Sequence, residues 1–195
     1  MSVAIPQILE TMLARRSAWP LAAPAPSAGE LETILQAAAV APDHAGLRPW
    51  HFKVVQGEDR QALLQQVLQH ADAQTEQVRA LHGKYALKLT TAPVVIVLAA
   101  RITPHPKAPE FEQLLAAGAA VMNMLNAAHV LGYSGFWSST PAPLDALLHQ
   151  VMAFDPQDRM IGLLNLGTPV NPGKNTAPRA VWQEYAQLWK SAMPE

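Results

Sequence analysis

The sequence predicts one three-layer domain of the α/β or α+β class, in which helices flank a central sheet. Apolar segments with the period of a helix alternate along the chain with short runs rich in β-branched residues. No internal repeat and no linker interrupts the 195 residues. Half of the residues are apolar and 15% are charged, which is typical of a folded chain. We therefore expect residues 1–195 to form a single domain.

The expected elements are two helices followed by alternating strands and helices. Ser27 and Glu30 form a capping box at the start of the second helix, which ends before Pro42. Residues 93–100 are a continuous apolar run, typical of a strand that is buried on both faces. We expect helices at residues 7–16, 27–41, 58–88, 112–131, 144–154 and 178–193, and strands at residues 51–55, 93–100, 133–139 and 160–166.

The helix at residues 112–131 has almost no polar face, so we expect it to be buried all round. Its small residues, 116–120, allow another helix to approach closely. In a chain of this length, the same helix of a second subunit is an attractive partner.

Composition excludes several classes of protein. The net charge of -1, with no long run of one sign, argues against a nucleic-acid binder. The absence of cysteine excludes disulfides, thiolate nucleophiles and iron–sulfur clusters, and it fits a reducing cytoplasm. The N-terminal order of charges is not that of a secretory signal, and no apolar run is long enough to span a membrane. We expect a cytoplasmic protein.

Common catalytic motifs are also absent. The sequence has no GxGxxG, no Walker lysine loop and no GxSxG elbow. Its seven histidines form no HExxH pair, so we expect no metal site.

Four loop segments remain as candidates for a binding site. Arg15, Arg16 and Ser17 offer two guanidinium forks and a hydroxyl to an anion, or alternatively the arginines cap the last carbonyls of the first helix. Residues 41–52 form a stiff polar loop or a packed turn. Residues 135–140 lie at a strand end and residues 166–169 lie just past a buried strand, where α/β proteins place their ligand crevices.

Taken together and in order, these segments resemble the nitroreductase family of flavoproteins, especially its minimal-length members. The motifs are Arg-Arg-Ser at 15–17, Ala-Pro-Asp-His at 41–44, Pro-Trp-His-Phe at 49–52, Ala-Pro at 92–93, Ala-Gly-Ala-Ala-Val-Met at 117–122, Gly-Phe-Trp-Ser-Ser at 135–139 and Gly-Leu-Leu-Asn-Leu-Gly-Thr-Pro at 162–169. The resemblance implies an α+β nitroreductase-like fold with a central mixed sheet, and an interlocked homodimer that binds two FMN molecules at its interface.

The resemblance also implies an NAD(P)H-dependent oxidoreductase that passes hydride through FMN to a nitroaromatic, a quinone or a similar small electrophile. The flavin carries the chemistry, so no side chain is expected to be catalytic. Arg15 and Ser17 would bind the FMN phosphate and ribityl chain, Arg16 would lie beside them near the flavin N1–C2=O edge, and His44 would reach the flavin from the partner subunit. The remaining expected cofactor-binding residues are Trp137, Ser138, Ser139, Gly167 and Thr168. Residues 127–132 correspond to a region associated with the nicotinamide nucleotide.

This chain departs from the family at three positions. Ser138 and Val40 stand where relatives carry arginine, so two cations are missing, and we expect Lys174 or Arg179 to compensate. Arg48 stands where many relatives have glutamine, which would shift the substrates that are tolerated.

Three hypotheses follow: an FMN oxidoreductase, a protein that stores or senses FMN with little turnover, and a structural dimer without FMN. The joint presence of Arg15, Ser17 and His44 argues against the third.

Overall fold

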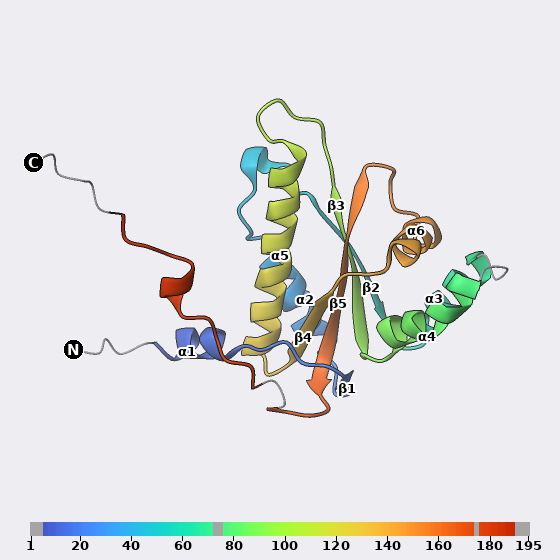
Figure 1. Cartoon of the computed structure of the whole chain (residues 1–195), viewed down its shortest axis with the longest axis horizontal. Coiled ribbons are helices and arrows are strands. Elements are labelled where there is room, and N and C mark those ends of the chain that lie inside the picture. The colour runs from blue at the N-terminus through green and yellow to red at the C-terminus, as the bar shows by residue number, and fades with distance from the viewer. Residues whose placement is uncertain (1–5, 72–75, 174–175, 190–195) are drawn as a thin grey trace, which may run out of the picture.

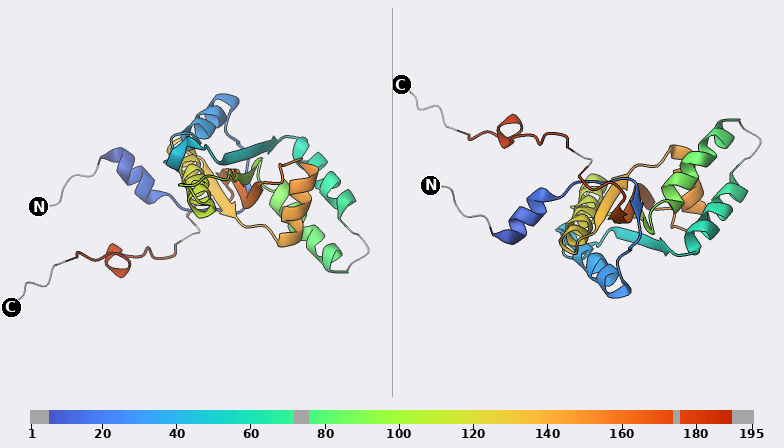
Figure 2. Two further views of the ribbon diagram at one scale, coloured as in Figure 1. Left: turned by 90° about the horizontal axis from the view of Figure 1, so that it is seen from above. Right: turned by 90° about the horizontal axis from the view of Figure 1, so that it is seen from below.

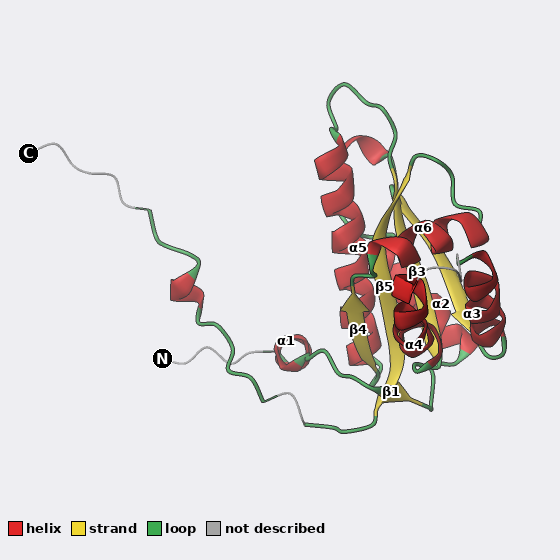
Figure 3. Cartoon of the chain, turned by 45° about the vertical axis from the view of Figure 1, so that its right-hand side comes forward, coloured by secondary structure: helices red, strands yellow, loops and turns green. Residues whose placement is uncertain are grey.

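A five-stranded sheet lies between two layers of helices in the computed structural model, which describes residues 6–71, 76–173 and 176–189 (Figures 1 and 3). The strands are β1 (Leu21–Ala22), β2 (Trp50–Gln56), β3 (Val94–Arg101), β4 (Ser134–Ser138) and β5 (Asp158–Pro169). The helices are α1 (Gln7–Ala14), α2 (Ala28–Ala38), α3 (Asp59–His70), α4 (Glu76–Thr90), α5 (Glu110–Val130) and α6 (Ala142–Val151), with 3-10 turns at His44–Gly46 and Trp182–Glu184. This arrangement confirms the expected α+β class.

The long strand β5 organises the sheet. It pairs with β3, β4 and β1, and β3 pairs in turn with β2. All four pairings among the described residues are antiparallel, where we expected a mixed sheet. β3 is buried along its length except at Arg101, as its apolar run predicts, because helices cover both of its faces.

Helices cover both faces of the sheet (Figure 2), and each face has its own apolar core. On one face α2 and α5 pack against β3 and β5, and the predicted capping box of Ser27 and Glu30 begins α2. On the other face α3, α4 and α6 contribute buried side chains that include Val67, Tyr85 and Leu148.

Two of the predicted helices are wrong. Residues 58–88 form two helices, because one helix of that length would extend about 46 Å and half of it would find no sheet to cover. Within the described part of residues 178–193, the chain has only the 3-10 turn at Trp182–Glu184. The side chains in the predicted register, Val181, Tyr185, Leu188 and Trp189, are all exposed, so no packing surface stabilises a helix there.

The helix α5 is not buried all round in the single chain. It covers the sheet with one face, whereas Phe111, Leu115 and Met122 are exposed on the other. Helix α1, which lies beyond α5 on the same side of the molecule, has no buried residue (Figure 2). Among the described residues, no helix has the length and apolar character needed to cross a membrane.

Candidate functional site

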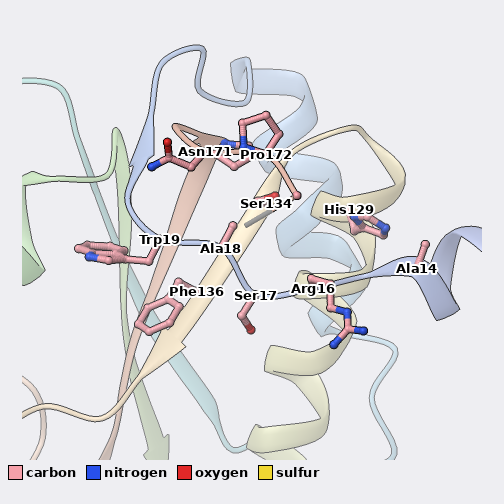
Figure 4. Close-up of a pocket in the computed structure, with 12 residues that line it drawn as sticks. Ala14, Arg16, Ser17, Ala18, Trp19, His129, Ser134, Phe136, Asn171 and Pro172 are labelled. Atoms are coloured by element: carbon pink, nitrogen blue, oxygen red, sulfur yellow. The ribbon is translucent and has the colours of Figure 1, made fainter. Parts of the chain in front are cut away.

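A pocket of about 490 Å³ lies beside the C-terminal end of α5 (Figure 4). Its walls come from the segment after α1, the end of α5, one face of β4 and the segment after β5. The lining residues are Ala14, Arg16, Ser17, Ala18, Trp19, His129, Ser134, Phe136, Pro169, Asn171, Pro172 and Gly173. The first, third and fourth of the predicted loop segments therefore meet around one cavity.

Arg16 lines this pocket, and Arg15 and Arg179 lie next to it in the structure. Helix α1 ends at Ala14, so Arg15 and Arg16 lie in the extended segment that follows the helix. Arg15 Nη1 is buried without a hydrogen-bond partner, and Arg179 Nη2 donates to the Arg15 carbonyl oxygen at 2.8 Å. Burial lowers the pKa of Arg15, and the neighbouring charges of Arg179 and Arg16 lower it further. Arg15 thus has a buried, unpartnered donor close to two further positive charges, and an anion bound there would stabilise this combination.

An aromatic wall closes one side of the pocket. The rings of Trp19 and Phe136 lie 5.4 Å apart between centroids. Strand side chains alternate between faces, so Ser134, Phe136 and Ser138 share one face of β4. This face extends for about 13 Å, at about 3.3 Å per residue.

Lys88 is a cation that the sequence reasoning missed. From the last turn of α4, its Nζ donates to Ser138 Oγ at 3.1 Å and to the Ser139 carbonyl oxygen at 2.8 Å. Burial lowers the pKa of Lys88, and the charge of Asp145 opposes that effect. An ammonium group thus lies beside Ser138, the position at which the resemblance implies an arginine. The one feature of the sequence that could have pointed to Lys88 is its place shortly before the Ala-Pro at 92–93, which precedes β3.

Three of the predicted cofactor-binding residues make structural contacts within the chain. Trp137 points to the other face of β4, where its Nε1 donates to the Ile161 carbonyl oxygen at 3.0 Å. Thr168 Oγ1 donates to the Pro24 carbonyl oxygen at 2.9 Å. A Cβ added at Gly167 would lie 2.8 Å from the Ala22 carbonyl oxygen, so the backbone approach there requires glycine.

His44 lies in a second cavity, of about 390 Å³, at the other end of α5. Its Nδ1 is 2.5 Å from Glu112 Oε2 in the first turn of that helix. The loop that carries His44 is closed by Arg48 N–H, which donates to Asp43 Oδ2 at 2.6 Å. Ala45 and Arg48 have φ values of 70° and 50°, a left-handed conformation that costs about 1–3 kcal/mol at a non-glycine residue.

The two cavities are too far apart to share one ligand within a chain. Helix α5 rises about 1.5 Å per residue, so Glu112 and His129 are separated by about 25 Å along its axis. The structure thus brings Arg16 and Ser17 together with Ser134 and Phe136 around one pocket. Trp137, Ser138 and Ser139 are not among its lining residues, and His44 lies apart in the second cavity. Of the residues expected to compensate for missing cations, Arg179 contacts Arg15, and Lys174 lies outside the described residues. Val40 is exposed near the end of α2.

A further cluster of charges lies at the start of β5. His51, Asp155 and Asp158 bring ligand atoms within 4.8 Å of one another, but Arg101 contacts all three and supplies the positive charge. Burial of Asp158 opposes its ionisation. The Asp155 N–H, His51 and Arg101 outweigh that effect and hold the pKa of Asp158 below its usual value. The cluster joins β2, β3 and β5.

This chain is similar to known proteins in both sequence and fold. The model of the nitroreductase family matches residues 12–168. The chain is 37% identical over 161 residues to YdjA of Escherichia coli (strain K12), provisionally named an NAD(P)H nitroreductase, covering 83% of this chain and 87% of YdjA. It is 35% identical over 164 residues to a protein of Haemophilus influenzae with the same provisional name, covering 82% of this chain and 87% of the relative.

Solved structures also share the fold. A nitroreductase-like family protein from Bacillus cereus superimposes with a TM-score of 0.79 at 24% identity, covering 98% of this chain and 100% of that one. The FMN-dependent nitroreductase NfnB from Mycobacterium smegmatis, solved with NADPH, gives a TM-score of 0.71 at 16% identity, covering 94% of this chain and 99% of that one.

Proposed function

Because this chain belongs to the nitroreductase family, we propose that it binds FMN and reduces a small electrophile, such as a nitroaromatic or a quinone, at the expense of NAD(P)H. When bound, FMN supplies the two-electron carrier between nicotinamide and acceptor. The protein supplies binding, orientation and charge, and residues 1–195 would act as one domain.

The observation that carries the proposal is the arginine cluster beside the larger pocket. A phosphate monoester is a dianion with several acceptor oxygens, and guanidinium forks match its geometry. The buried Nη1 of Arg15 gains a partner when such a group binds, and the mutual repulsion of Arg15, Arg16 and Arg179 is relieved. The residues present therefore fit the phosphate end of FMN.

The rest of the pocket suits a planar ring system. Its volume of about 490 Å³ is within the range of cofactor sites, and the aromatic wall of Trp19 and Phe136 offers apolar contact. Lys88 lies at the Ser138 end of the same strand face, where a cation favours a negatively charged reduced ring.

A homodimer would complete the site. A two-fold axis near the small residues in the middle of α5 would pack the two α5 helices antiparallel and cover Phe111, Leu115 and Met122. That packing brings the Glu112 end of one helix to the His129 end of the other. His44 of one subunit would then reach the pocket of its partner, as the resemblance implies.

The test is the visible spectrum of the purified, FMN-loaded protein before and after anaerobic addition of NADPH or NADH. We expect flavin bands that bleach and that return when a quinone is added. Arg16→Gln should weaken FMN binding, whereas Arg159→Gln, which removes an exposed arginine paired with Glu110, should not. Protein that takes up no FMN would refute the proposal. Bound FMN that neither nucleotide bleaches would favour a storage or sensor protein instead.

A further inference from the structure

The imidazole of His44 makes a close contact with the carboxylate of Glu112. The distance of 2.5 Å joins His44 Nδ1 to Glu112 Oε2, across 68 positions of sequence. The remaining lining of their cavity is mostly apolar, with Pro42, Leu115, Ala116 and Ala119 beside Asp43. In the proposed dimer this cavity faces the partner subunit, because Leu115 belongs to the exposed stripe of α5.

The contact fixes the state of the imidazole ring. Nδ1 must carry a proton to donate to the carboxylate, which leaves Nε2 to exchange a proton with a ligand. A carboxylate in this position orients the ring. Among the charged groups nearby, Asp43 accepts the Arg48 N–H and Glu110 pairs with Arg159, so Glu112 is the carboxylate that faces the ring.

We propose that His44, held in place by Glu112, is the acid that protonates the electrophile as it is reduced. This inference rests on the proposed function, which supplies the electrons. Reduction of a quinone to a hydroquinone consumes one hydride equivalent and one proton. The proton leaves His44 Nε2 as the new O–H bond forms on the acceptor. The neutral ring keeps its Nδ1–H on Glu112 and regains a proton from water, since the His44 side chain is half exposed.

Two acceptors separate proton delivery from electron transfer. Enzyme reduced anaerobically with NADPH is mixed in a stopped-flow instrument with either benzoquinone or ferricyanide. Ferricyanide takes electrons alone and needs no acid. General acids typically contribute about 10²–10⁴-fold, so His44→Asn should slow reoxidation by benzoquinone about 100-fold and leave reoxidation by ferricyanide within about twofold. His70→Asn, at an exposed histidine of α3, is the matched control.

Glu112 is a positioning residue, so its loss should act only through His44. We expect Glu112→Gln to slow the quinone reaction about 10-fold, and the double variant to be no slower than His44→Asn alone. Glu110→Gln, two positions away, is the control for charge. Independently of activity, the NMR signal of the His44 Nδ1 proton in the FMN-loaded protein should be protected from exchange in the wild type and exposed in Glu112→Gln.

Equal slowing of both acceptors by His44→Asn would mean that His44 holds the cofactor and would overturn proton delivery. An unchanged quinone rate would overturn it as well. Wild-type protein that NADPH does not reduce would instead refute the proposed function, so the two failures are distinguishable.

Discussion

Replacing Gly162 by alanine should disturb the fold and the site together. Gly162 lies beside a bulge in the ladder between β3 and β5, where Leu98 pairs with Gly162 and Ala99 pairs with Met160. Its φ of +114° is a conformation that essentially only glycine adopts. A Cβ there would lie 2.4 Å from the Ser138 carbonyl oxygen and 3.3 Å from Trp137 Nε1. Backbone atoms have little freedom to move away, so β4 must shift.

The expected loss combines two effects. Backbone strain costs about 1–3 kcal/mol and the steric overlap adds about 1–3 kcal/mol. A loss of about 4 kcal/mol is a large part of the stability of a typical domain, which is about 5–15 kcal/mol. Because β4 carries Ser138 and borders the pocket, FMN affinity should fall as well.

Urea unfolding of the flavin-free protein, followed by far-UV circular dichroism, measures this loss. Gly83→Ala is the matched control, since Gly83 lies inside α4 with no atom within 4 Å of an added Cβ. It should stabilise the protein by up to about 1 kcal/mol through helix propensity. A free energy of unfolding for Gly162→Ala within about 0.5 kcal/mol of the wild type would refute this reasoning.

Three further predictions concern charge and assembly. Lys88→Met should weaken FMN binding by about 10–100-fold, measured by quenching of flavin fluorescence, because one charge-assisted hydrogen bond is worth about 1.5–3 kcal/mol; unchanged affinity would place Lys88 outside the site. The lowered pKa of Asp158 stabilises the fold above the usual aspartate pKa of about 3.9, and this stabilisation is lost as pH falls through the lower folded value. Asp158→Asn should therefore reduce the free energy of unfolding at neutral pH by about 3–5 kcal/mol. It should also weaken the dependence of this free energy on pH in the acid range, and the same pH dependence in the variant and the wild type would contradict this. Leu115→Glu should produce monomers in gel filtration, whereas Leu87→Glu, at an exposed position of α4, should not.

Sequence patterns over a few adjacent residues predicted much of the fold. The capping box located the start of α2, and the β-branched run located β3, because both depend on a few adjacent residues. The helical spacing of apolar residues wrongly predicted a helix at residues 178–193. Such spacing stabilises a helix only where a neighbouring surface buries the apolar side chains. The break between α3 and α4 likewise depends on the size of the sheet, which no local pattern encodes.

The site was predictable only in part for the same reason. The predicted segments at 15–17 and 135–140 do meet, because a strand end and the segment after α1 converge beside α5. Lys88 is 50 positions from Ser138 and lies within a helix, so no spacing rule connects them. Trp137, Gly167 and Thr168 follow the family motif, yet within one chain their contacts hold the backbone together.

In the proposed enzyme, FMN is held between two copies of this chain. Sedimentation velocity of the FMN-loaded protein, recorded at the flavin absorbance band, tests it directly. We predict that all bound flavin sediments with the dimer, at one FMN per subunit, and that Leu115→Glu monomers carry almost none. Flavin that sediments with the monomer at full occupancy would contradict a shared site.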